Sequence, residues 1–197
     1  MIIYGAGGHA KVVFDASQKE ITYIVDDNVL ITEFKNKPVS AYDPTLNLNE
    51  EVVIAVGDNA TRKKIVAKMS HRFTTVEALS AIIDSTVKIG LGSMILHGAI
   101  VQADTKIGEH TIVNTGASID HDCSIGDFCH IAPQVTLCGE ATVGDGTIIG
   151  SGATVVPAVT IGKWCKIGVG SVVTKNIPDF GVAVGNPARV IKIDEQR

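Results

Sequence analysis

The sequence predicts a small α/β domain followed by a parallel β-helix, and three observations lead to this fold class. Every sixth residue from position 83 to position 173 is aliphatic, and no insertion breaks this register. Residues 1–80 lack the period and instead alternate short apolar segments with helical ones. The 197 residues include 20 Gly but only five Phe, three Tyr and one Trp, which favours a repeat architecture with a core of small and aliphatic side chains.

The N-terminal segment, residues 1–80, predicts a small Rossmann-like parallel sheet. Strands are expected over 1–4, 21–25, 52–56 and 73–76, and helices over 10–19 and about 60–69. Sheets of this kind bind ligands at the carboxyl ends of their strands. The loops after the first three strands are therefore the candidate binding loops.

The loop after the first strand has the spacing of a phosphate-binding turn. Gly5, Gly7 and Ala10 fit the looser form of the dinucleotide-binding fingerprint, and Asp26 and Asp27 end the second strand. Loop N–H groups and the start of the next helix can face phosphates. The segment is too short for two mononucleotide-binding halves, so we expect one nucleotide diphosphate here. The glycines could instead serve only a tight turn.

The six-residue period of residues 81–175 fits neither an α-helix nor a simple alternating strand. A small or β-branched residue stands two positions before each aliphatic residue, and Gly often follows the aliphatic residue directly. This pattern fits a short strand plus a corner, with three sides closing a coil of 18 residues. Residues 18 apart then stack at about 4.8 Å, which predicts a parallel β-helix of about five coils.

Charge and composition exclude several function classes. The net charge is -4, with 17 Lys+Arg against 21 Asp+Glu, which argues against nucleic-acid binding. The chain has no basic signal-peptide start and no run of about 18 apolar residues, so a cytoplasmic protein without a membrane segment is expected. No C-x-x-C pair occurs, and we expect buried free thiols at Cys123, Cys129, Cys138 and Cys165.

The repeat resembles that of the left-handed β-helix acyltransferases, and the whole chain resembles the sialic acid O-acetyltransferase family. The resemblance is nearest to the nucleotide-linked 4-amino-sugar N-acetyltransferases of the bacillosamine type, through the GAGGHAK opening, the Asp26-Asp27 pair and the His121-Asp122 pair. It implies a left-handed parallel β-helix of hexapeptide repeats, closed by residues 176–197. It also implies a homotrimer in bacterial glycan biosynthesis, with active sites and acetyl-CoA between subunits and no metal.

The same resemblance assigns the catalytic pair. His121 stands where relatives carry the general base, and a histidine near neutral pKa suits deprotonation of an amine. Asp122 would orient the ring, as the acid does in a catalytic triad. Many relatives carry Glu there, so the reach of the shorter Asp side chain is open. Either residue could also be an ordinary solvated side chain.

Binding residues follow from the resemblance as well. The nucleotide-sugar would be bound by Gly7, Gly8, His9, Asp26, Asp27 and Gly57. Acetyl-CoA would be bound by His130, Gly139, Ser151 and Val169. Gly139 lies 18 residues after His121, one coil above it, where its amide could stabilise an oxyanion. His130 could instead be an ordinary surface side chain, and Gly139 could serve only the geometry of the corner.

The expected reaction is acetyl transfer from acetyl-CoA to the 4-amino group of a UDP- or dTDP-linked 4-amino-4,6-dideoxy sugar. Two alternatives stay open: an O-acetyltransferase acting on sialic acid or another sugar, and a non-catalytic nucleotide-sugar-binding trimeric scaffold. A zinc site is disfavoured, because β-helix carbonic anhydrases use a histidine pair five residues apart whereas His121 and His130 are nine apart. The sequence does not decide between UDP, dTDP and GDP.

Overall fold

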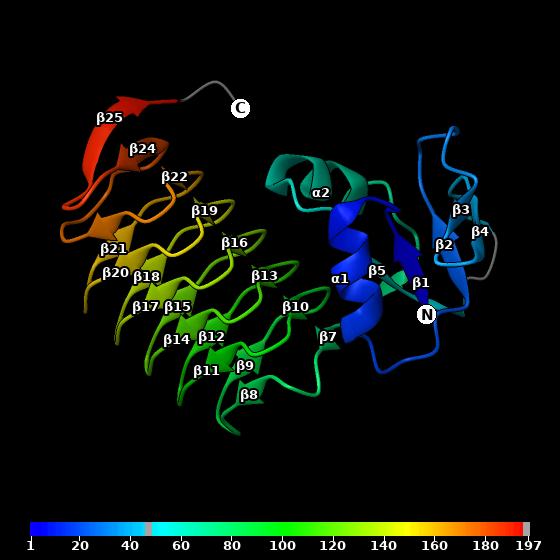
Figure 1. Cartoon of the computed structure of the whole chain (residues 1–197), viewed down its shortest axis with the longest axis horizontal. Coiled ribbons are helices and arrows are strands. Elements are labelled where there is room, and N and C mark those ends of the chain that lie inside the picture. The colour runs from blue at the N-terminus through cyan, green and yellow to red at the C-terminus, as the bar shows by residue number, and fades with distance from the viewer. Residues whose placement is uncertain (46–48, 195–197) are drawn as a thin grey trace.

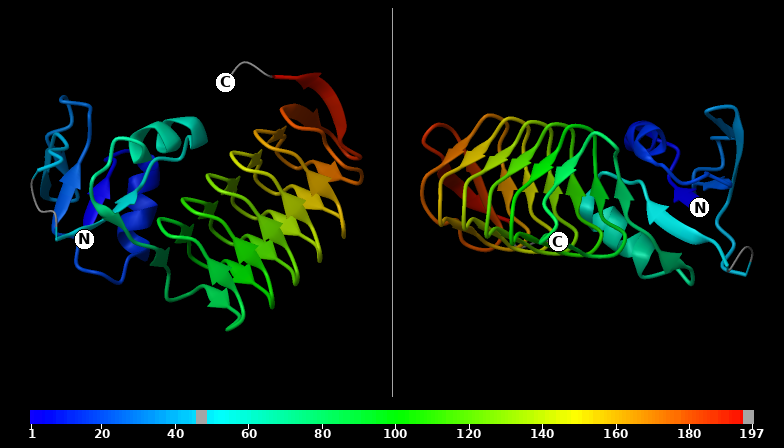
Figure 2. Two further views of the ribbon diagram at one scale, coloured as in Figure 1. Left: turned by 180° about the vertical axis from the view of Figure 1, so that it is seen from behind. Right: turned by 90° about the horizontal axis from the view of Figure 1, so that it is seen from below.

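The computed structural model describes residues 1–45 and 49–194 and has the two parts that the sequence predicts. A small α/β unit lies against one side of a three-sided β-helix (Figure 1). Figure 2 shows the turns of the β-helix stacked as parallel loops, with the α/β unit at the N-terminal end of the stack. Neither helix of the described chain is long and apolar enough to cross a bilayer.

The α/β unit is built on a parallel sheet with β1 at its centre. The strands β1 (Ile2–Tyr4), β2 (Tyr23–Val25), β5 (Glu51–Ile54) and β6 (Arg72–Phe73) run parallel in the order β2-β1-β5-β6. The sequence did not predict the hairpin of β3 (Glu33–Phe34) and β4 (Lys37–Ser40), which extends the sheet beyond β2. Its turn residues Lys35 and Asn36 adopt positive φ without the glycine that usually signals such a turn.

Two short helices cover this sheet. Helix α1 (Gly8–Ala16) buries Ala10, Val13 and Ala16. Helix α2 (Asn59–Val66) begins after Asp58, whose side chain accepts the N–H of Thr61 at 2.8 Å. Both helices are shorter than the sequence predicts at their C-terminal ends.

Three parallel sheets form the sides of the β-helix. Face I contains β7 (Val76–Glu77), β10 (Met94–Ile95), β13 (Ile112–Val113), β16 (His130–Ile131), β19 (Ile148–Ile149), β22 (Lys166–Ile167) and β24 (Gly181–Val184), and antiparallel β25 (Arg189–Ile193) closes it. Face II contains β8 (Ile82–Ile83), β11 (Ile100–Val101), β14 (Ser118–Ile119), β17 (Thr136–Leu137), β20 (Thr154–Val155) and β23 (Val172–Val173). Face III contains β9 (Lys88–Ile89), β12 (Lys106–Ile107), β15 (Ser124–Ile125), β18 (Thr142–Val143) and β21 (Thr160–Ile161).

The β-helix begins earlier than the six-residue pattern indicates. The expected strand over 73–76 is divided: Arg72–Phe73 complete the α/β sheet, whereas Val76–Glu77 pair with β10 of the β-helix. The first turn therefore starts before residue 81, and the six strands of face II make the stack one turn longer than expected.

The interior of the β-helix follows the repeat. Aliphatic residues 18 apart, such as Ile119, Leu137 and Val155, stack and are fully buried. The small interior positions also form hydrogen bonds: Thr105 donates its hydroxyl to the carbonyl of Asp120 and accepts the N–H of Cys123. Cys123, Cys129 and Cys165 are buried and Cys138 is half-buried, and all four are free thiols. A narrow core of this kind has no room for large aromatic side chains.

The two parts of the chain share one apolar core. Ile3 and Val13 of the α/β unit belong to the same buried cluster as Val76, Met94 and Ile112, which point outward from face I. Burying outward-facing apolar residues fixes the α/β unit on this face. The candidate binding loops are therefore held over face I.

Candidate active site

His121 and Asp122 form a hydrogen-bonded pair at the corner between faces II and III. Asp122 has φ +58°, and it shares this corner with Asp104 and Glu140, which also have positive φ. The Nδ1 atom of His121 lies 2.8 Å from Oδ2 of Asp122, so the shorter carboxylate does reach the ring. A carboxylate on Nδ1 selects the tautomer that leaves Nε2 free to accept a proton.

The carboxylates at this corner make His121 a stronger base. Its hydrogen bond to Asp122, with the nearby charges of Asp120 and Glu140, raises the pKa of His121 above its ordinary value. The side chains of His121 and Asp122 are both about half exposed, at 54% and 56%. A substrate can therefore reach the ring.

Gly139, one turn above, makes room for the imidazole. A Cβ on this glycine would lie 2.8 Å from Nε2 and 2.7 Å from Cε1 of His121. The equivalent corner positions carry Ala103 one turn below His121 and Pro157 one turn above Gly139. The backbone thus tolerates a side chain there, and the ring of His121 is what requires glycine. Within the described chain the N–H of Gly139 donates to no acceptor.

The carboxyl ends of β1, β2 and β5 bring the expected nucleotide-binding residues together. Gly5 has φ +111°, which lets the chain turn between β1 and α1. Asp26 accepts the N–H of Ala6 at 2.8 Å, which ties the second strand to the glycine loop. Gly7 and Gly8 are exposed, with no atom within 4 Å of the position of a Cβ. This space is open to the backbone approach of a ligand.

Asp27 lies beside Tyr4 at the same edge of the sheet. Burial and the neighbouring Asp27 carboxylate raise the pKa of Tyr4. Asp27 itself is exposed, and Asp26 is half-buried. Asp26 thus supports the loop, whereas Asp27 remains accessible to a ligand.

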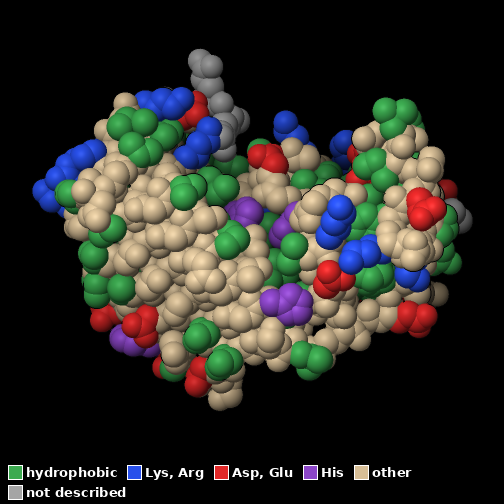
Figure 3. All heavy atoms as spheres, viewed as in Figure 1, with side chains coloured by type: hydrophobic (Ala, Val, Ile, Leu, Met, Phe, Trp, Pro, Cys, Tyr) green, Lys and Arg blue, Asp and Glu red, His purple; other side chains and the backbone are tan. Residues whose placement is uncertain are grey.

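His9 and His130 meet where the α/β unit contacts face I. Their ring centroids are 6.1 Å apart, and a Cβ on Gly57 would lie 3.9 Å from His9. Nε2 of His130 lies 3.0 Å from the side-chain nitrogen of Asn114. Burial lowers the pKa of both histidines to about 4, so both rings are neutral at physiological pH. Figure 3 shows histidine side chains gathered where the α/β unit meets the β-helix.

Arg62, which the sequence analysis did not single out, fastens α2 to the β-helix. Its side chain is fully buried and donates from Nε to the carbonyl of His110 at 2.8 Å and from Nη1 to that of Val56 at 2.9 Å. It also donates to the carbonyls of Phe128 and Cys129, just before β16. Desolvation lowers the pKa of Arg62 to about 10. The only sign of this role in the sequence is that one basic residue lies on the buried side of a short helix.

Ser151 and Val169 stack at a different corner, between faces I and II. Val169 is 79% exposed, and the neighbouring Gly152 and Gly170 have positive φ with no atom near the position of a Cβ. Such a corner leaves room for an extended ligand along the stack. Arg189, in β25, is exposed.

One chain does not bring all the expected site residues together. The glycine loop lies over face I, whereas His121 lies at the corner between faces II and III, on the other side of the β-helix. The candidate nucleotide-binding loops are therefore remote from the candidate base of the same chain.

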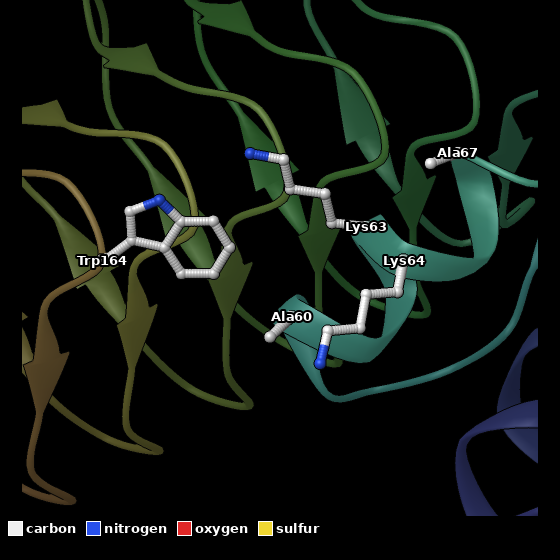
Figure 4. Close-up of a pocket in the computed structure, with 5 residues that line it drawn as sticks. All are labelled: Ala60, Lys63, Lys64, Ala67 and Trp164. Atoms are coloured by element: carbon white, nitrogen blue, oxygen red, sulfur yellow. The ribbon is translucent and has the colours of Figure 1, made fainter. Parts of the chain in front are cut away.

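A groove of about 380 Å³ between α2 and Trp164 holds none of the expected residues. Ala60, Lys63 and Lys64 of α2 line it, together with Ala67 just after the helix (Figure 4). Nζ of Lys63 lies 5.3 Å from the centre of the Trp164 ring. In the described part of the chain, no group of three or more His, Cys, Asp or Glu side chains is placed to bind a metal ion.

Two family models match parts of this chain. Residues 1–69 match the family model of the PglD N-terminal domain, and residues 104–139 and 140–175 match that of the bacterial transferase hexapeptide (six repeats). Comparison with curated proteins gives no match.

Solved structures match almost the whole chain. PerB from Caulobacter crescentus, in complex with CoA and GDP-perosamine, is 35% identical with a TM-score of 0.92, over 97% of this chain and 96% of that chain. The acetyltransferase domain of PglB from Neisseria gonorrhoeae, in complex with acetyl coenzyme A, is 32% identical with a TM-score of 0.87, over 96% and 98%. WeeI from Acinetobacter baumannii is 30% identical with a TM-score of 0.88, over 96% and 98%. The expected left-handed β-helix is thereby confirmed, and the chain belongs to the hexapeptide-repeat sugar N-acetyltransferases with a PglD-type N-terminal domain.

Proposed function

We propose that this protein transfers the acetyl group of acetyl-CoA to the 4-amino group of a nucleotide-linked 4-amino-4,6-dideoxy sugar. The observation that carries this proposal is the His121 ring, held on Nδ1 by Asp122, with Nε2 beside Gly139. The nucleotide is UDP, dTDP or GDP. The complex of PerB with GDP-perosamine is the reason to keep guanine among the bases that are tested.

His121 acts as the general base in a direct attack. Nε2 of His121 takes a proton from the amine as the amine nitrogen bonds to the carbonyl carbon of the thioester. The amide of Gly139 donates to the oxygen that gains negative charge. The C–S bond then breaks, and its electron pair leaves on sulfur. A thiol is far more acidic than an amine, so this departure needs little help from an acid.

The remaining residues bind the two substrates. Gly7, Gly8 and His9 face the nucleotide-sugar, and Gly57 closes the same pocket. Asp27 accepts hydrogen bonds from the nucleoside, and Asp26 holds the loop in place. Ser151, Val169 and His130 contact the coenzyme. Because both substrates are metabolites of the cytoplasm, the protein acts there.

The active site forms between subunits of a homotrimer. The glycine loop lies over face I, and His121 lies across the β-helix from it. A sugar held by the loop of one subunit therefore meets the base of a neighbour. Two inactive variants, one changed at His121 and one at Gly8, should regain activity when their subunits are mixed.

Thiol release tests the proposal. The protein is given acetyl-CoA with a UDP-, a dTDP- or a GDP-linked 4-amino sugar, or with free sialic acid. We expect release with one of the nucleotide-linked amines, and a loss of about 10²-fold or more in His121→Ala. The control is His97→Gln, because His97 lies at another corner and contacts Ser80.

Three outcomes would contradict the proposal. Release with sialic acid alone would favour the O-acetyltransferase. Binding of a nucleotide-sugar without any thiol release would favour the scaffold. Full activity in His121→Ala would exclude this base.

A further inference from the structure

The imidazole of His121 stands between two carboxylates, and only one of them is needed to orient it. Asp122 binds Nδ1 at 2.8 Å. Asp120, on the other side, accepts the backbone N–H of His121 at 2.9 Å. Its Oδ1 atom lies 4.0 Å from Nε2, which is too far for a hydrogen bond to the ring. Asp120 is therefore fixed beside the nitrogen that must take the proton, without occupying it.

The gap between Asp120 and Nε2 fits one nitrogen atom of a substrate. For a nitrogen about 2.8 Å from each acceptor, the angle between the two acceptors at the nitrogen would be about 90°. Two N–H bonds of a tetrahedral ammonium can approach this angle. Half of the Asp120 side chain is exposed, at 49%. Among the described residues, no Lys or Arg forms an ion pair with Asp120 or Asp122. Glu140 at the same corner adds further negative charge.

An amine that arrives here is mostly a cation. Aliphatic amines beside electron-withdrawing groups have pKa values of about 8, so the ammonium predominates at neutral pH. A carboxylate attracts this cation, and a charge-assisted hydrogen bond is about twice as strong as a neutral one. A hydroxyl acceptor gains no such attraction. The corner therefore distinguishes the two acceptor types by charge.

We infer that Asp120 binds the acceptor as its ammonium and so determines that an amine, not a hydroxyl, is acetylated. This inference rests on the proposed function. The bound ammonium loses one proton to Nε2 of His121, and the half-exposed ring passes that proton to water. The neutral amine then has a lone pair for attack, and its second proton leaves to His121 as the C–N bond forms. Asp120 is thus a specificity-determining residue, and no electron transfer is involved.

Asp120→Asn is the test, because it keeps an oxygen for the N–H of His121 but removes the charge. At pH 7 we expect KM for the amino-sugar nucleotide to rise about tenfold, with KM for acetyl-CoA unchanged. As the pH rises through the pKa of the acceptor amine, the ratio of wild-type to variant kcat/KM should fall toward one. A role in shape alone would give a ratio that does not depend on pH. The matched control is Asp104→Asn, which removes a carboxylate one turn below Asp122 and should leave both KM values unchanged.

The outcomes separate this inference from the proposed function. A wild-type protein that acetylates no amino-sugar nucleotide refutes the proposed function itself. Active wild type with an unchanged acceptor KM in Asp120→Asn overturns the role of Asp120. A raised acceptor KM in Asp120→Asn overturns it as well if the ratio of wild-type to variant kcat/KM does not depend on pH. A 4-hydroxy analogue of the acceptor should inhibit wild type and Asp120→Asn equally, and a loss of its inhibition in Asp120→Asn would count against recognition by charge.

Discussion

Replacing Arg62 by Met should loosen the α/β unit from the β-helix. Met has similar length but no donor and no charge. The guanidinium donates to carbonyls on both sides of the contact, Val56 and Gly57 in the β5–α2 loop and His110, Phe128 and Cys129 in the β-helix. Without it, most of these carbonyls lose their donor while they stay buried or partly buried.

The size of the effect follows from two opposing contributions. A buried acceptor left without a donor costs about 1–3 kcal/mol. Cys129 keeps one bond, because its carbonyl also accepts the N–H of Ile112. Of the other four carbonyls, that of His110 is in a buried contact and the remaining three are in partly buried ones, where the cost is smaller. Removing a buried charge that lacks a carboxylate partner recovers several kcal/mol of desolvation. We therefore expect a net loss of about 3 kcal/mol, the low end for breaking a buried charged network.

Trp164 provides the assay, because it is the only tryptophan and lines the groove beside α2. Unfolding in urea is followed by Trp164 fluorescence and by circular dichroism, at one fixed protein concentration since a trimer is expected. Arg62→Lys, with three donors in place of five, should lose less than Arg62→Met. Lys64→Met, an exposed cation on the same helix, is the control. Arg62→Met within about 0.5 kcal/mol of this control would refute the reasoning.

Three further predictions concern the corner and the buried histidines. Gly139→Ala should lower kcat about 10²-fold, because its Cβ would displace the His121 ring, and steady-state kinetics measure this. Asp122→Asn should move the acid limb of the kcat/KM profile to lower pH, because loss of the carboxylate lowers the raised pKa of His121. His110→Phe should reduce acid unfolding. Burial lowers the pKa of His110 to about 4, so folding is destabilised as the pH falls from about 6.5, where the unfolded imidazole takes up a proton, to about 4.

Each of these has a control. An unchanged melting temperature should accompany the loss of activity in Gly139→Ala, and ordinary turnover in that variant would show that the ring does not need the space. A shift of the acid limb to higher pH in Asp122→Asn would contradict the assigned tautomer. His110 stacks on Phe128, with centroids 5.2 Å apart, and its Nδ1 has no partner among the described residues, so Phe keeps the aromatic contact and breaks no hydrogen bond of Nδ1. An equally steep acid transition in His110→Phe would place the acid sensitivity elsewhere, with His9 and His130 as the next residues to test.

The repeat could be predicted because its signal is local, whereas the catalytic role of His121 and Asp122 stays a prediction. A period of six forces every aliphatic residue inward, and Ile119, Leu137 and Val155 stack accordingly. The strands of the α/β unit were found near their predicted places, whereas the β3–β4 hairpin was missed because Lys35 and Asn36 turn without glycine. The sequence left open whether Asp122 reaches His121, and the positive φ of Asp122 at this corner accompanies the 2.8 Å contact that the structure shows. The assignments of the binding residues stay predictions.

The sequence by itself determined the two kinds of structure, the interior of the β-helix and the corner that carries His121. Only the tertiary structure decided where the α/β unit packs, and with it that His9 meets His130, that Arg62 is buried, and that the glycine loop lies across the β-helix from the base. The physical reason is that a six-residue period fixes which side chains point inward but leaves the outward ones unconstrained. Which face receives the α/β unit depends on the apolar outward residues Val76, Met94 and Ile112, and burial of those three against α1 involves residues far apart in the chain.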